Sequence, residues 1–178
     1  MHGVVLVMFR QMNNDEFDRV FELMSRSFPE DEYRDYDKQK HLVGRDDYRI
    51  YVDVDGQAVR AFLAVYEFEN FVFVEHFAVD PAFRNHGLGS AMLSRLIRSS
   101  GKPLCLEVEL PSTQIAARRI GFYGRSGFIL NDFEYYQPKL RAGTGILPLR
   151  IMSCPDALSR EQFERVKAVL YSRVYDVQ

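Results

Sequence analysis

The chain has 178 residues, of which 47% are hydrophobic and 27% charged, and its formal net charge is −2. This balance is typical of a folded protein with a sizeable core and excludes a disordered chain. It gives no indication of nucleic-acid binding, and no stretch is long and apolar enough to span a bilayer. We therefore expect one domain over residues 1–178, with neither nucleic acid nor membrane as a partner.

Cysteine and histidine give no sign of a disulfide framework or a metal site. Cys105 and Cys154 are too few for a framework, and the histidines lack the spacing of metal ligands. Cys105 lies in an apolar run, so we interpret it as a small buried hydrophobe and keep a catalytic thiol as the alternative. No secretory signal is visible, since the apolar run Val4 to Phe9 is short and has no basic lead. We expect a cytoplasmic protein without a bound metal.

The first third of the chain predicts a strand, a helix and a hairpin. The run Val4 to Phe9 is apolar enough for a buried strand. A helix should follow and end before Pro29, because its apolar residues recur at helical spacing (Phe17, Phe21, Met24, Phe28). The strands at residues 48–54 and 58–68 should form a hairpin around Asp55-Gly56.

The rest of the chain alternates between predicted strands and helices. We expect strands at residues 71–79, 104–110, 128–130 and 147–152, and an irregular loop at residues 131–145. Helices should run from Leu88 to Ser100, from Thr113 to about Gly124, and from Ser159 through Val174. No repeat or linker separates two domains, so the order fits one sheet flanked by helices.

A turn with two glycines connects the strand at residues 71–79 to the next helix. It reads Arg84-x-x-Gly87-x-Gly89. Glycine lets a ligand approach the backbone closely, and the unpaired N–H groups and dipole of a helix start attract phosphate. We interpret the turn as a pyrophosphate-binding loop. A dinucleotide-binding turn would need glycine where Met92 stands, and a plain helix entry would use the glycines for the bend alone.

A second motif lies farther along the chain and reads Phe122-Tyr123-x-x-x-Gly127-Phe128. With the loop before it, this order of motifs resembles the GNAT superfamily of acyl-CoA N-acyltransferases, most strongly over residues 47–130. The resemblance implies an α/β (α+β) fold, in which a single mixed, mostly antiparallel sheet is flanked by helices, and a single N-acetyltransferase domain over residues 1–178.

The resemblance also implies acetyl-CoA as the acyl-donor cosubstrate. In the family, the pantetheine arm lies between the strands equivalent to residues 71–79 and 104–110, and backbone groups of the first strand serve the arm and the oxyanion. The residues carried over as cofactor-binding are Phe77, Ala78, Val79, Arg84, Asn85, His86, Gly87, Leu88, Gly89 and Ser90. His86 is expected to contribute its backbone and not its imidazole.

Tyr123 matches the family's tyrosine that faces the CoA sulfur and often acts as general acid. The alternative is a packed tyrosine whose hydroxyl is satisfied within the core. One departure from the family pattern is Ala116, where many relatives have an asparagine. Its cofactor contact is therefore absent or supplied by another group.

The general base is predicted to be Glu75. It should share a strand face with Phe77, and a carboxylate in an apolar strand could have a raised pKa, which would suit deprotonation of an amine near neutral pH. Glu107, Glu109 and His76 are competitors, as is a water relay. The alternative role of Glu75 is a structural pair with an arginine.

The sequence thus predicts an N-acetyltransferase that moves an acetyl group from acetyl-CoA directly to a primary amine of a small molecule or peptide. The alternative function is a non-catalytic CoA-binding or regulatory module of the same fold. The sequence also leaves open whether the protein forms a homodimer. Acidic residues crowd a segment that, by resemblance, borders the acceptor site, which would favour cationic acceptors; a solvated loop is the alternative. These residues are Glu30, Asp31, Glu32, Asp35 and Asp37.

Overall fold

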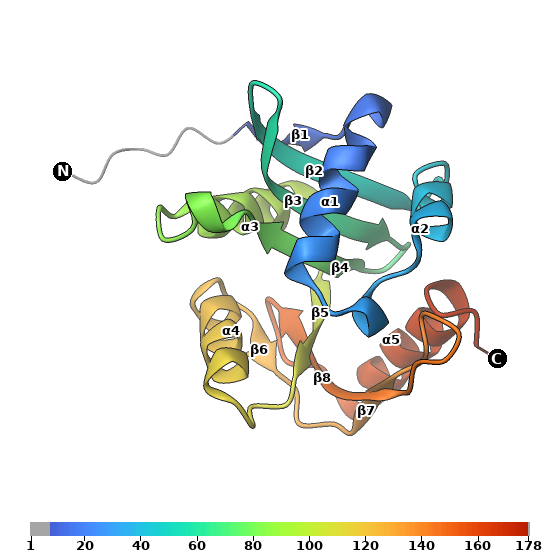
Figure 1. Ribbon diagram of the computed structural model, residues 1–178. Coiled ribbons are helices and arrows are strands. Elements are labelled where there is room, and N and C mark those ends of the chain that lie inside the picture. The colour runs from blue at the N-terminus through green and yellow to red at the C-terminus, as the bar shows by residue number, and fades with distance from the viewer. Residues whose placement is uncertain (1–7, 178) are drawn as a thin grey trace. The chain divides into compact units, whose positions relative to one another are not determined.

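A computed structural model describes residues 8–177 of the protein. The chain forms two compact units, residues 1–102 and residues 103–178. The secondary-structure elements are labelled in Figure 1.

The first unit is an antiparallel sheet covered on both faces by helices. Its strands pair in the order β1, β2, β3, β4, with α1 crossing one face and α3 on the other (Figure 1). The sheet core is apolar, and Phe62, Leu63 and Val65 have no exposed surface. The bounds are β1 (Arg10–Gln11), α1 (Phe17–Ser27), α2 (Tyr36–Leu42), β2 (Tyr48–Asp55), β3 (Ala58–Glu67), β4 (Val72–Val79) and α3 (Leu88–Ser100), with 3-10 turns η1 (Asn14–Glu16), η2 (Glu30–Glu32) and η3 (Pro81–Phe83).

The second unit is built around β8, which pairs antiparallel with β5, β6 and β7. Helix α4 begins at a cap in which the Thr113 hydroxyl accepts a hydrogen bond from the Ala116 amide. Helix α5 begins at a capping box between Ser159 and Gln162. The bounds are β5 (Leu104–Glu109), α4 (Gln114–Arg125), β6 (Ile129–Leu130), β7 (Tyr135–Gln137), β8 (Leu147–Cys154) and α5 (Arg160–Arg173).

The register of the first sheet shifts at two places. Ala64 lies opposite His76 and Val65 lies opposite Val74, so Glu75 is an extra residue in β4. Two residues facing one is a β-bulge, which breaks the alternation of side chains along the strand. Beyond the bulge the alternation resumes, so Phe77, opposite Leu63, points to the other face from His76.

Most predicted elements within the described residues are confirmed, with corrections at two places, Phe28 and residues 135–137. The predicted strand at residues 4–9 lies mostly outside the described residues, and β1 contains only Arg10 and Gln11. Phe28 follows helix α1 as an extended residue and is not part of it. The loop predicted at residues 131–145 is wrong at residues 135–137, which form β7, because a strand this short has no periodicity to detect.

Candidate acetyl-CoA site and catalytic residues

The predicted phosphate loop is shaped by two left-handed residues and two side-chain contacts. Asn85 and Gly87 have φ angles of 66° and 79°, the conformation that glycine adopts most easily. The Asp80 carboxylate accepts a hydrogen bond from the Ala82 amide at 2.9 Å. The Arg84 Nε donates to the Val79 carbonyl oxygen at 2.9 Å, which ties the loop to the end of β4.

The start of α3 fits a phosphate group. Gly87 is the N-cap and provides no side-chain cap for the first amides of the helix, and these amides have no partner within the helix. Apart from the residues next to it in the chain, no heavy atom of residues 8–177 lies within 4 Å of where a Cβ on Gly87 would stand. Unpaired amides beside open space are what a pyrophosphate oxygen needs, so the predicted loop residues fit the diphosphate of CoA.

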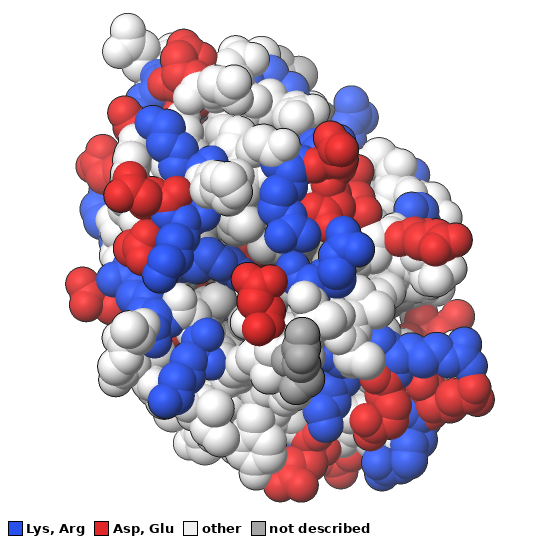
Figure 2. Space-filling model, turned by 90° about the vertical axis from the view of Figure 1, so that its right-hand side faces the viewer, with Lys and Arg blue, Asp and Glu red and all other residues white. Residues whose placement is uncertain are grey.

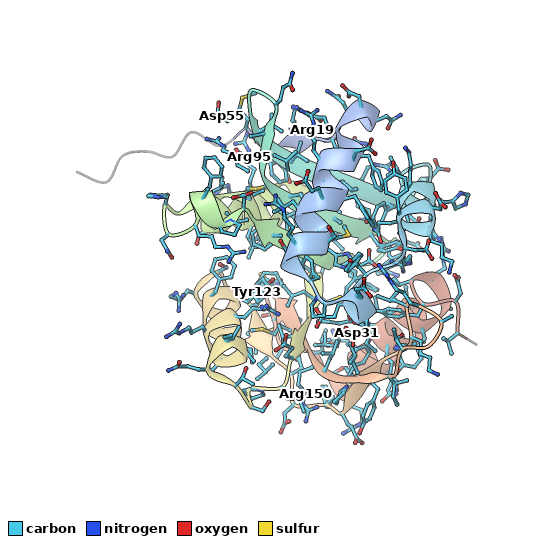
Figure 3. All side chains as sticks on the ribbon, viewed as in Figure 1. Arg19, Asp31, Asp55, Arg95, Tyr123 and Arg150 are labelled. Carbon is cyan, nitrogen blue, oxygen red and sulfur yellow. The ribbon has the colours of Figure 1, made fainter. Side chains whose placement is uncertain are left out.

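Tyr123 lies on α4 in the second unit (Figure 3) with its ring buried against Phe122 and Phe128. Burial raises the pKa of its hydroxyl to about 12, against a small opposing effect of Arg119. Among residues 8–177 the hydroxyl has no hydrogen-bonding partner. A protonated hydroxyl without a protein partner differs from the satisfied core tyrosine that was the alternative.

Glu75 is buried and paired with an arginine. The Arg34 guanidinium donates to the Glu75 Oε1 at 2.6 Å, and the two side chains are 10% and 3% exposed. Burial alone would raise the pKa of Glu75, but the charges of Arg34 and His76 lower it to about 2. The expected raised pKa is therefore wrong, and the base role of Glu75 stays a prediction.

The expected position of Glu75 on the face of Phe77 is also wrong. Its Oε2 lies 3.4 Å from the Nδ1 of His76, a residue that would point the other way in a regular strand. The bulge turns both side chains toward the segment between α1 and α2. The Nε2 of His76 donates to the Glu32 carbonyl oxygen at 2.8 Å, so Nδ1, which faces Glu75, is the ring nitrogen that could accept a proton, and the competing base role of His76 stays a prediction.

Glu107 and Glu109 have different surroundings in the second unit. The Glu107 carboxylate accepts hydrogen bonds from the hydroxyls of Tyr135 and Tyr175, the latter at 2.8 and 2.7 Å. Burial and the Glu107 charge raise the pKa of Tyr135. Glu109 forms an ion pair with Arg119 at 3.1 Å, where both side chains are 39% exposed.

Part of the acidic segment, residues 30–37, takes part in local hydrogen bonds and ion pairs. Asp35 caps α2 by accepting from the Lys38 amide, and its carboxylate lies 3.1 Å from the Lys38 ammonium. Glu30 and Asp37 are exposed, and Asp31 is half-buried at the position labelled in Figure 3. Acidic and basic side chains are interspersed over the face shown in Figure 2.

Sequence reasoning missed Arg34, Tyr135 and Tyr175. Each contacts a glutamate far away in the chain, at separations of 41, 28 and 68 residues. Arg34 stands in an acidic, polar segment that gave no periodic signal. The burial of Arg34 can be recognised only when Glu75 on β4 is known to be its ion-pair partner.

Two kinds of feature are absent from the part of the chain that the structure describes. Over residues 8–177 no helix is long and apolar enough to cross a membrane. Over the same residues, no three His, Cys, Asp or Glu side chains gather where they could hold a metal ion.

Comparison with known proteins identifies the family. The sequence model described as the acetyltransferase (GNAT) family matches residues 17–128. A structure described as a GNAT-family acetyltransferase from Bacteroides thetaiotaomicron is 32% identical with a TM-score of 0.88, over 97% of this chain and 100% of that chain. Among curated proteins the sequence finds no significant match.

Two more distant structures share the fold. The ribosomal-protein-S18-alanine N-acetyltransferase from Escherichia coli is 21% identical with a TM-score of 0.64, over 88% of this chain and 97% of that one. The acetyltransferase yncA from Salmonella typhimurium, solved with acetyl-CoA, is 20% identical with a TM-score of 0.60, over 86% and 96%. The predicted fold class, a mostly antiparallel sheet flanked by helices, is confirmed by these matches. The chain belongs to the GNAT family and is an acyl-CoA-dependent N-acetyltransferase.

Proposed function

We propose that the enzyme moves an acetyl group from acetyl-CoA directly to a primary amine of a small molecule or peptide. The observation that carries the proposal is the state of Tyr123, whose hydroxyl is unpaired among the described residues and has a pKa of about 12. Such a group is protonated near neutral pH and can give a proton to the departing thiolate.

The donor would be held by the loop and by the end of β4. Amides at the start of α3 would bind the diphosphate, with Gly87 leaving room for it. Backbone groups of Phe77, Ala78 and Val79 would serve the pantetheine arm and the oxyanion. The complete set proposed for the cosubstrate is Phe77, Ala78, Val79, Arg84, Asn85, His86, Gly87, Leu88, Gly89 and Ser90.

In this proposal Tyr123 is the general acid, and the amine attacks the thioester without an acyl-enzyme. Glu75 is the proposed base. Because its ion pair with Arg34 weakens it as a proton acceptor, Glu107 is a competitor for this role. A single catalytic domain over residues 1–178, a cytoplasmic location and a homodimer remain predictions.

Donor binding is tested by thermal unfolding with acetyl-CoA. At a hundred times its dissociation constant the ligand should stabilise the fold by about 2.7 kcal/mol. Gly87→Val should remove this stabilisation. Gly56→Val is the matched control, because Gly56 also has a positive φ, 57°, and no atom within 4 Å of its Cβ position; it should keep the shift. An unchanged melting temperature of the native protein would refute donor binding.

Catalysis is tested by thiol release with a panel of amines. Tyr123→Phe should lower turnover by roughly 10²–10⁴ and leave acetyl-CoA binding nearly unchanged. Tyr171→Phe is the control, since it removes a hydroxyl that donates to the Tyr136 carbonyl oxygen at 2.6 Å; its turnover should stay near native. A non-catalytic module would bind acetyl-CoA and release no thiol with any amine.

A further inference from the structure

A cavity of the first unit lies at the end of α3 that is opposite to the phosphate loop. It has a volume of about 190 Å³ and is lined by residues of β2, β3, β4 and α3 and by Lys102, just beyond the helix. Helix α3 begins at Leu88 and ends at Ser100, so roughly 18 Å of helix separates its two ends. None of the residues proposed for acetyl-CoA lines this cavity.

The first charged group of the cavity is Glu67, at the end of β3. The Tyr51 hydroxyl donates to the Glu67 Oε1 at 2.8 Å, and Phe9 stacks on the Tyr51 ring with 4.7 Å between centroids. Burial and the Glu67 carboxylate raise the pKa of Tyr51 to about 12, so its hydroxyl is a donor near neutral pH. Among residues 8–177 the other carboxylate oxygen, Oε2, has no hydrogen-bonding or ion-pair partner. The carboxylate is therefore held in place and keeps one oxygen for a further donor.

The second charged group of the cavity is Lys102. Its Nζ donates to the Phe68 carbonyl oxygen at 2.7 Å, and an ammonium group has further N–H donors. Within the described part of the chain Lys102 forms no ion pair. Glu67 and Lys102 thus line one cavity with opposite charges that do not pair with each other.

The rest of the lining is apolar or already hydrogen-bonded. Val72 and Leu96 supply apolar surface. The hydroxyls of Ser99 and Ser100 donate to backbone carbonyl oxygens three residues earlier, each at 3.3 Å, so they serve the last turn of the helix. Recognition in this cavity therefore depends on the two charges and on a small apolar contact.

We propose that this cavity, which we call the α3-end cavity, binds a small apolar α-amino acid in its zwitterionic form. The ammonium of the ligand would donate to the Glu67 Oε2, and its carboxylate would accept from the Lys102 ammonium. Hydrogen bonds between charged groups are about twice as strong as neutral ones. A ligand with a single charge would leave one of the two side chains unpaired, so the pair favours a ligand that carries both charges.

The volume of the cavity limits the size of the ligand. A cavity of about 150 Å³ in another protein holds benzene, so about 190 Å³ holds roughly eight non-hydrogen atoms. L-valine has this size, and its isopropyl group would contact Val72 and Leu96. A ligand this small is expected to bind with a dissociation constant of about 1 mM.

The inference goes beyond the proposed function and does not rest on it. Binding of L-valine is measured without acetyl-CoA, by calorimetry and by NMR shifts of the amides of Glu67 and Lys102. A protein that binds L-valine and not acetyl-CoA would refute the proposed function and leave this inference intact.

The first test compares L-valine with two analogues on the wild-type protein. Isovalerate lacks the ammonium group, and valinol lacks the carboxylate. L-valine should saturate the protein with a dissociation constant of about 1 mM or lower, and each analogue should bind at least roughly tenfold more weakly. No saturation by L-valine up to roughly 10 mM, or equal binding of all three compounds, overturns the proposal. This test needs no variant, so it also covers the case in which a variant does not fold.

The second test locates the site with Glu67→Gln and Lys102→Met. Each substitution removes one charge and nearly keeps the size of the side chain, so each should raise the dissociation constant of L-valine at least roughly tenfold. The matched controls are Glu69→Gln and Lys139→Met, which remove exposed charges that do not line the cavity; both should bind L-valine like wild type. Native affinity in either cavity variant, or an equal loss in the controls, overturns the proposal.

Discussion

Two strand glutamates, one in each unit, are stabilised in different ways. Glu75 in β4 is paired with the Arg34 guanidinium, whereas Glu107 in β5 accepts hydrogen bonds from two tyrosine hydroxyls. A cation keeps a carboxylate ionised far into acid and weakens it as a proton acceptor. Hydroxyl donors leave the carboxylate charge in place and supply no opposite charge. The two glutamates would look alike as bases in the sequence, yet their surroundings suit different tasks.

The largest expected effect separates the two glutamates as bases. If Glu75 is the base, Glu75→Gln should lower kcat by roughly 10²–10⁴ and remove or move the acidic limb of its pH profile. The measurement uses saturating acetyl-CoA, so that a change in donor affinity does not enter kcat. An unmoved limb in Glu75→Gln together with its loss in Glu107→Gln would transfer the role to Glu107.

The cost of removing a partner should differ between the two sites. Arg34→Met leaves a buried carboxylate without its cation and should lower the free energy of unfolding by about 3–5 kcal/mol. Tyr175→Phe removes one hydroxyl from Glu107 and should cost about 1–2 kcal/mol. Urea unfolding of both variants measures the difference. Equal losses would mean that the ion pair adds nothing beyond a hydrogen bond.

The ion pair of Glu75 should make the free energy of unfolding depend on pH in the acid range. Its pKa of about 2 in the folded protein lies below the ordinary value of 4.5, so its stabilisation is complete above pH 4.5 and is lost as the pH falls toward 2. The shift corresponds to about 3 kcal/mol. Glu75→Gln should lack this part of the pH dependence, and the part due to Glu16, whose pKa is also about 2, should remain. Identical pH dependence in wild type and variant would contradict the ion pair.

The smallest expected effect concerns the carboxylates of residues 30–37, which form a third kind of site. Carboxylates at the entrance of the acceptor site would raise the on-rate of cationic acceptors by roughly tenfold at low salt. The kcat/KM of a matched cationic and anionic acceptor at low and high salt measures this effect. A preference for the anionic acceptor, or no salt effect on the cationic one, would remove the hypothesis and leave the transferase. The residues concerned are Glu30, Asp31, Glu32, Asp35 and Asp37.

Features set by local sequence were predicted well. The hairpin turn at Asp55-Gly56, the helix end at Gly101 and the cap at Thr113 all occur where the sequence indicates, because each depends on a few neighbouring residues. The left-handed Gly87 at the start of α3 belongs to the same class, because a glycine and a helix start are read directly from the chain, whereas the binding of phosphate there stays a prediction.

Features set by distant contacts were not predicted. The face of Glu75 depends on a bulge, and a bulge is a relation between two strands that neither strand shows alone. Its pKa depends on Arg34, which is 41 residues away. Strand β7 was not predicted because its three residues gain their conformation from pairing with β8. The catalytic assignments that stay open are those that rest on such contacts.

The hydrogen bonds of the two glutamates also have an order in time during synthesis. Arg34 precedes Glu75, so the partner already exists when the ribosome adds the glutamate. Tyr175 follows Glu107 by 68 residues, which at about 5–20 residues per second corresponds to roughly 3–14 s of translation. Tyr135 follows Glu107 by only 28 residues, so for most of that interval Glu107 has one of its two tyrosines, and its hydrogen bonds are complete only when nearly all of the second unit has been made.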